Sequence, residues 1–169
     1  MKGSLMSGFT PCLWFFNRDA EEALTRYVEL FSAYGEAAVL HASRAGEGVP
    51  RTEAGDVLTM TVSLHGRELM GLNGGQAQFA HSEAFSMLVG CGSQEEVDHY
   101  WYGLLDGGGR EGQCGWLVDR WGISWQVVPT RLYELLGGSD PDGAQRAMVA
   151  MLAMQRLDVA TLEAAYAGE

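Results

Sequence analysis

The sequence has few cysteines, few basic residues and no long apolar run. Its three cysteines stand far apart and form no C-x-x-C pair, which argues against a disulfide framework or a zinc knuckle. Lys and Arg number 11 against 22 Asp and Glu, and the net charge is -11. Because binding to phosphates takes clustered basic side chains and these are scattered singly, we expect no nucleic-acid partner.

Membrane and export signals are missing as well. No window approaches the roughly 18–20 apolar residues that span a bilayer. The start, MKGSLMSGF, lacks the apolar run and cleavage site of a signal peptide. We therefore expect a cytoplasmic protein with no membrane partner. The sequence also contains no G-x-S-x-G elbow, P-loop or H-E-x-x-H motif, so the chemistries of those motifs are set aside.

Two segments of the chain share one helical pattern. Apolar residues recur at helical spacing from Ala20 to Phe31 and again from Val97 to Leu105. Ser93-x-x-Glu96 is a capping box for the second helix, and Asp19 or Asn17 is expected to cap the first. Each helix follows an apolar run, at residues 9–16 and 84–91, and precedes strand-like stretches. This order predicts a duplicated βαβββ module, at about 9–73 and 84–129.

The clearest strand is Val57–Leu64, in which apolar and polar residues alternate. Thr59 and Thr61 lie on its polar side, and the turn His65-Gly66 leads into a second strand, Arg67–Asn73. After the second module, three helical segments are predicted, beginning at Thr130, at Asp140-Pro141 and at Asp158.

The stretch QCGWLVDRWGISWQVVP at 113–129 carries three of the five tryptophans around a turn. Rings this large bury 150–250 Å² each, so the hairpin must line a core or a ligand cavity. Its pattern G-W…D…G-x-S-W-Q-x-V-P resembles the PhnB-like branch of the vicinal-oxygen-chelate (glyoxalase/bleomycin-resistance) superfamily, whose domain is often named 3-demethylubiquinone-9 3-methyltransferase. The start TPCLWF, the stretch LMGLNGG at 69–75 and the segment QEEVD at 94–98 match that branch in the same order.

The resemblance implies an α+β fold, with paired βαβββ modules forming a cupped mixed β-sheet and additional C-terminal helices. The PhnB-like domain would span residues 1–136. A helical extension, 137–169, would pack on the same domain or on a dimer partner. Sheet edges and an apolar stripe on the C-terminal helices also predict a homodimer.

Metal-dependent relatives hold a divalent ion through His and Glu on the first, fourth, fifth and eighth strands. Carried over, these positions are Cys12, the neighbourhood of Leu69 with Asn73, Ser86 (or Phe85 if the register slips), and Gln126. None is a histidine or a carboxylate, so little charge is available to hold a divalent ion. We expect no cofactor, although a divalent metal stays possible. The side chains expected to line the cavity are Cys12, Trp14, Thr59, Thr61, Asn73, Ser86, Trp116 and Gln126.

Two functions remain open from the sequence. The first is binding of a small apolar or aromatic molecule in the sheet cavity without a metal, because a few polar groups in an apolar hollow suit such a ligand. The alternative is a metal-dependent enzyme of the glyoxalase/dioxygenase type. Methyl transfer is not expected, because no glycine cluster follows the strand–turn–helix pattern of an S-adenosylmethionine site.

Overall fold

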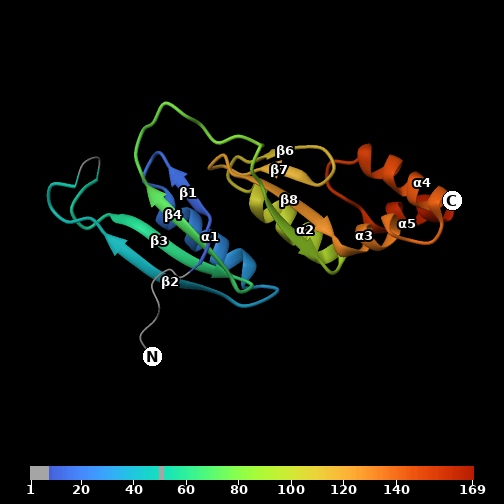
Figure 1. Ribbon diagram of the computed structural model, residues 1–169, viewed down its shortest axis with the longest axis horizontal. Helices are drawn as coiled ribbons and strands as arrows, with labels where there is room; N and C mark the ends of the chain where they lie inside the picture. The colour runs from blue at the N-terminus through green and yellow to red at the C-terminus, as the bar shows by residue number, and fades with distance from the viewer. Residues whose placement is uncertain (1–7, 50–51) are drawn as a thin grey trace. The chain divides into compact units, whose positions relative to one another are not determined.

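The computed structural model describes residues 8–49 and 52–169, and the chain divides into two compact units, residues 1–80 and 81–169. Each unit is described by itself. The first seven residues, which belong to the start that lacks a signal-peptide pattern, lie outside the described part, as do residues 50 and 51. Figure 1 labels the strands and helices in chain order.

Unit 1 is one βαβββ module with a four-stranded sheet in the order β1-β4-β3-β2. Its elements are β1 (Cys12–Phe15), α1 (Ala20–Phe31), β2 (Ala37–Arg44), β3 (Val57–Leu64) and β4 (Arg67–Asn73). Strand β1 runs parallel to β4, and the other pairs are antiparallel. One face of the sheet packs on α1, where Leu13, Phe15 and Val62 meet the buried stripe of the helix.

Unit 2 repeats this order. It contains β5 (Met87–Cys91), α2 (Gln94–Leu105), β6 (Arg110–Glu111), β7 (Trp116–Val118) and β8 (Ser124–Pro129), and its sheet has the order β5-β8-β7-β6. Again the first strand is parallel to the last. The predicted duplication is therefore confirmed. Both leading strands are shorter than their apolar runs, because the chain becomes regular only at Cys12 and Met87.

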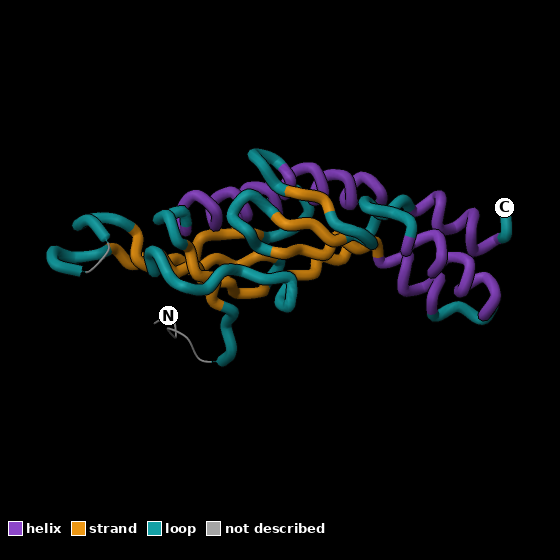
Figure 2. Tube along the Cα trace, turned by 90° about the horizontal axis from the view of Figure 1, so that it is seen from above, coloured by secondary structure: helices purple, strands orange, loops and turns teal. Residues whose placement is uncertain are grey.

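Three helices follow β8: α3 (Thr130–Leu136), α4 (Pro141–Leu152) and α5 (Val159–Ala167). Figure 2 shows α4 and α5 side by side. The predicted starts hold, because Asp140 accepts a hydrogen bond from the Asp142 amide and Asp158 accepts one from the Thr161 amide. An apolar cluster joins these helices to β8 through Val128, and comprises Val128, Leu132, Leu135, Ala147, Leu157 and Leu162.

The caps of α1 and α2 differ from one another. Ser93 caps α2 by accepting a hydrogen bond from the Glu96 amide, as predicted, while the Glu96 carboxylate accepts one from the Gly92 amide. For α1, Asp19 stands at the N-cap position, as one of the two predicted alternatives, but its side chain makes no capping hydrogen bond. The Ala20 amide donates instead to Oδ1 of Asn73, from the end of β4.

The fold class is confirmed as α+β, with paired βαβββ modules, mixed sheets and additional C-terminal helices. Within the described residues, none of the helices combines the length and the apolar character that crossing a membrane requires.

Candidate functional site

In each unit the sheet has one face toward its helix and a far face that carries most of the candidate residues. On β1, Cys12 and Trp14 alternate with the buried Leu13 and Phe15, so they point away from α1. Register extends this far face across the sheet. Cys12 lies opposite Met70, Trp14 opposite Leu72, and Thr61 and Thr59 lie opposite those same two residues from β3. The far face of unit 1 therefore carries Cys12, Trp14, Thr59, Thr61, Met70 and Leu72.

Trp14 is held in place by the segment that follows β4. Its Nε1 donates to the Gly75 carbonyl at 2.9 Å, and Phe79 meets the ring edge-on with centroids 5.3 Å apart. A Cβ on Gly74 would lie 2.1 Å from the indole ring, so only glycine lets the backbone approach this closely. The ring that was expected to form a cavity wall is thus partly covered by residues 74–79.

Asn73 lies on the opposite side of the sheet from the predicted cavity. It is only 4% exposed, and its Nδ2 donates to the Val57 carbonyl at 2.8 Å while its Oδ1 receives the Ala20 amide. Leu69 also faces α1. Because side chains alternate along a strand, the far face at β4 is formed by Met70 and Leu72, which were not among the predicted cavity residues. The glycine at position 71 was the sequence feature that could have indicated this orientation. A Cβ there would lie 2.8 Å from Leu24 of α1, so position 71 faces the helix and its neighbours Met70 and Leu72 face the other way.

In unit 2 the structure brings Gln126, Ser86 and Trp116 together. Gln126 stands between the buried Trp125 and Val127, so it faces away from α2, as the sequence analysis proposed. Its Nε2 donates to Oγ of Ser86 at 2.8 Å. Trp116 lies opposite Gln126 on β7, and Leu88 lies opposite it on β5. Leu88 is half exposed and was missed from the sequence.

Asp119 explains why the tryptophan hairpin has its pattern. This carboxylate is 4% exposed and accepts three hydrogen bonds, from the Trp121 amide at 2.9 Å, the Ile123 amide at 3.0 Å and Nε1 of Trp125 at 2.9 Å. It therefore fixes the β7–β8 turn and anchors Trp125 on the α2 side. That anchoring sets the register in which Gln126 faces the other way.

Two further residues belong to the far face of unit 2. Val118 lies opposite Ser124, and both follow the alternation of Trp116 and Gln126. Ser124 is only 3% exposed, and its Oγ has no hydrogen-bond partner. Beyond Gln126, Val128 on the same face is buried by the cluster that joins the C-terminal helices to β8.

The thiols of Cys12 and Cys91 are poorly suited to metal binding or nucleophilic attack. Burial raises the pKa of the Cys91 thiol to about 12, and the nearby Glu96 carboxylate adds to this shift. Desolvation also raises the pKa of Cys12 on the far face of unit 1. Because the thiolate is the reactive and metal-binding form, neither group is activated near neutral pH.

The donor set for a metal is correspondingly weak. Across residues 8–49 and 52–169, His, Cys, Asp and Glu side chains form no group of three or more that could hold an ion. Of the four positions carried over from metal-dependent relatives, Cys12, Ser86 and Gln126 lie on far faces and Leu69 faces α1. The residues present offer an amide, a hydroxyl and an unactivated thiol, which do not fit a divalent ion.

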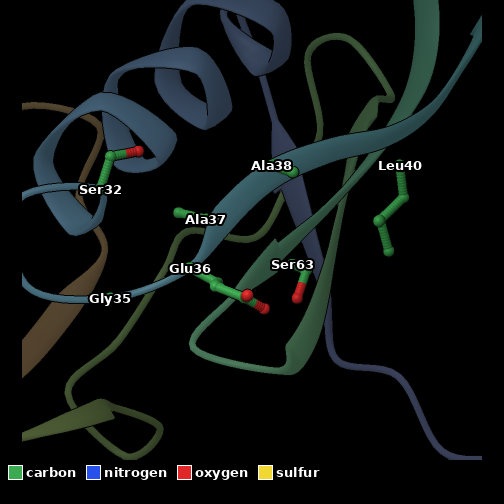
Figure 3. Close-up of a pocket in the computed structure, with 7 residues that line it drawn as sticks. All are labelled: Ser32, Gly35, Glu36, Ala37, Ala38, Leu40 and Ser63. Carbon is green, nitrogen blue, oxygen red and sulfur yellow. The ribbon is translucent and has the colours of Figure 1, made fainter.

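Two surface hollows of unit 1 lie away from these residues. One, of about 480 Å³, lies beside the start of β2 and is lined by Gly35, Ala38, Leu40 and Ser63 among others (Figure 3). The other, of about 540 Å³, is lined by Phe16, Asn17, Arg18, Gly75 and Gln76. Both are open to solvent, and neither contains a candidate side chain. The far faces are therefore defined by strand register and hydrogen bonding, and not by either of these hollows.

The paired βαβββ modules are those of a protein of the vicinal-oxygen-chelate superfamily. The family model described as 3-demethylubiquinone-9 3-methyltransferase matches residues 7–128, and the chain belongs to this family. The match ends in β8, so α3, α4 and α5 lie beyond it.

The chain is also similar to several solved structures. The PhnB protein from Bacillus cereus, which carries the same methyltransferase name, is 29% identical with a TM-score of 0.65, covering 73% of this chain and 100% of that one. A protein from Pseudomonas aeruginosa is 17% identical with a TM-score of 0.60, covering 73% and 98%, and shows the fold alone. The fosfomycin resistance protein FosX from Listeria monocytogenes, complexed with Mn(II) and sulfate, is 14% identical with a TM-score of 0.43, covering 72% and 88%. No curated protein matches the chain.

Proposed function

We propose that this protein binds a small, mostly apolar or aromatic molecule on the far faces of its sheets, without a bound metal. The observation that carries the proposal is the Gln126–Ser86 hydrogen bond, set between Trp116 and Leu88 on the neighbouring strands. One placed polar pair among apolar side chains is typical of a small-molecule site. Gln126 has a carbonyl and a second N–H that can orient a ligand without charge.

Metal independence is proposed from the residues present. The anionic and imidazole ligands that stabilise a divalent ion are replaced by Gln126, Ser86 and Cys12, and the Gln126 amide already donates to Ser86. Methyl transfer is not proposed, because the turn after β1, Phe16–Asp19, contains no glycine and the sheets are mixed four-stranded ones.

Binding is tested with the neutral aromatic dye N-phenyl-1-naphthylamine, titrated into the full chain by fluorescence and by calorimetry. We expect saturable binding at one class of site, and addition of EDTA or of Mn²⁺, Ni²⁺ or Zn²⁺ is expected to leave the affinity unchanged. Absence of saturable binding would count against a ligand site for apolar compounds.

Elemental analysis separates the proposal from the alternative of a metal-dependent glyoxalase/dioxygenase-type enzyme. Protein purified without added metal is expected to contain far less than one ion per chain. Near-stoichiometric nickel, zinc, iron or manganese, lost together with dye binding on EDTA treatment, would favour the enzyme instead.

A further inference from the structure

The chain that leads into β5 crosses the far face of unit 2. Glu83 forms an ion pair of 2.5 Å with Arg110 on β6, which is one edge of the sheet. Ser86, three residues later, bonds to Gln126 on β8, next to the opposite edge. Residues 83–86 therefore pass over the sheet from β6 toward β5, and we call them the strap.

Strand register shows which side chains lie under the strap. Arg110 lies opposite Val118, and Val118 lies opposite Ser124, so these three residues form one row on the far face. Gln126 belongs to the next row. A path from Arg110 to Gln126 thus passes over Val118 and Ser124. Coverage by the strap accounts for the burial of Ser124, which is 3% exposed and makes no hydrogen bond through its Oγ.

The strap has little apolar anchoring. Residues 83–85 are exposed, and Phe85, the one large apolar side chain among them, is 55% exposed. The side chains of the Glu83–Arg110 pair are 56% and 65% exposed, so solvent and salt screen it. From Glu83 to Ser86 the segment is tied to the sheet by one exposed ion pair and one hydrogen bond, and a segment tied in this way opens at low free-energy cost.

We propose that the strap is a gate over the proposed ligand site, held shut from outside by Glu83–Arg110 and from inside by Ser86–Gln126. This rests on the proposed function for its ligand. When the strap opens, the hydroxyl of Ser124 and the amide of Gln126 become available side by side on one strand. Loosening the outer ion pair raises the rate at which the far face is uncovered without altering the fold.

The test labels the covered face directly and needs no ligand. In the full-length variant Ser124→Cys, a pulse of N-ethylmaleimide is followed by mass spectrometry of each cysteine peptide. Labelling at position 124 is expected to be much slower than at the exposed Cys12 and faster than at Cys91, which is fully buried and reports global unfolding. Val118→Cys serves as a second reporter should Ser124→Cys fold poorly.

Adding Arg110→Gln is expected to speed labelling at 124 roughly two- to five-fold, the range that an exposed ion pair supports. The Cys91 rate should stay constant. The charge swap Glu83→Arg with Arg110→Glu should restore slow labelling. Arg131→Gln, which breaks an exposed pair between α3 and α5, is the matched control and should change nothing.

Labelling at 124 as fast as at Cys12, or unaffected by Arg110→Gln, would overturn the gate. A labelling rate at position 124 that rises only together with the labelling rate of Cys91 would overturn it as well, because global unfolding would then explain both. Stopped-flow binding of N-phenyl-1-naphthylamine adds a separate readout, with a faster association rate expected for Arg110→Gln. If the dye does not bind, the proposed function fails while the labelling still decides whether the strap opens.

Discussion

Gln126 makes the contact on which the proposed site depends, and its effect on binding can be separated from its effect on folding. It is half-buried, and its hydrogen bond to Ser86 holds the strap. We predict that Gln126→Ala weakens binding of N-phenyl-1-naphthylamine or of the natural ligand by about 1–3 kcal/mol, the cost of a lost polar contact in a desolvated site. Calorimetric titration of wild type and variant measures the difference.

Gln145 on the exposed side of α4 provides the matched control, and Gln145→Ala is expected to bind as wild type does. Both variants should keep the wild-type circular dichroism spectrum. Equal affinities for Gln126→Ala and wild type would reduce Gln126 to a packing residue of β8. The double variant Gln126→Glu with Cys12→His is not expected to create a tight metal site, because Ser86 and the β4 residues stay non-ligating.

Asn73 is structural, and its contribution belongs to folding. Its two buried hydrogen bonds join the first amide of α1 to the start of β3, so removing the side chain leaves a helix amide and a strand carbonyl unpaired. We predict that Asn73→Ala lowers the free energy of unfolding by about 2–4 kcal/mol, the sum of two such losses. Urea denaturation followed by tryptophan fluorescence measures it. Asn17→Ala, at an exposed position, should stay within about 0.5 kcal/mol.

At the scale of single elements, the cap of α5 makes a pH-dependent prediction. Hydrogen bonds from the hydroxyl and amide of Thr161 lower the pKa of Asp158 below its usual value, with a smaller contribution from Arg156. The ionised cap therefore stabilises the folded state above the unfolded pKa, near 3.9, and this stabilisation is lost as the pH falls through the lower folded value. Asp158→Ala should cost about 1 kcal/mol at pH 7.

Comparison of urea unfolding for wild type and Asp158→Ala between pH 7 and pH 3 checks this. The difference should stay constant down to about pH 5 and shrink only below the unfolded pKa. Asp158→Asn, which keeps an acceptor without the charge, should retain most of the stability at pH 7. A difference that already shrinks between pH 7 and pH 5 would contradict the assigned cause.

Regular elements were predictable because their causes are local. Helical spacing found α1 and α2, alternation found β3, and the capping residues Ser93 and Asp158 fixed helix starts. The two residues of β6 carry no comparable periodicity. The hydrogen bond from the Ala20 amide to Asn73 was not predicted, because the two residues lie 53 positions apart. The strap was not predicted either, because its Glu83–Arg110 pair joins positions 27 apart.

The candidate site was predictable only where one strand decided the outcome. Gln126 and Trp125 had to face opposite ways, and the tryptophan was the better core residue, so the orientation of Gln126 followed from alternation. The prediction put Asn73 on the cavity side of its sheet, which is wrong. The face on which Asn73 lies is set by the close packing on Leu24 of Gly71, two residues earlier in β4. Whether the remaining candidates contact a ligand stays a prediction.

At the scale of the whole molecule, the C-terminal helices form an apolar cluster of their own that also takes in one residue of the family domain. They bury Val128 of β8, and Arg156 pairs with Asp98 on α2 while the Val159 amide donates to Gln94. The extension therefore holds both the far face and the helix side of unit 2. The β8 end of the far face is covered at Val128.

The exposed side of α4 carries Val149 and Leu152, which are 57% and 58% exposed, one turn apart on the helix. Because paired apolar side chains gain from burial, we predict a homodimer that contacts through this stripe. Light scattering at micromolar concentration should give twice the 18.3 kDa of the chain. The double variant Val149→Lys with Leu152→Lys should give the monomer mass, since two desolvated charges would face their own copies.

Tyr102→Lys, at an equally exposed position on α2, is the control and should stay dimeric. A monomeric wild type would contradict the prediction. A dimer that survives the double variant would show that the interface lies elsewhere.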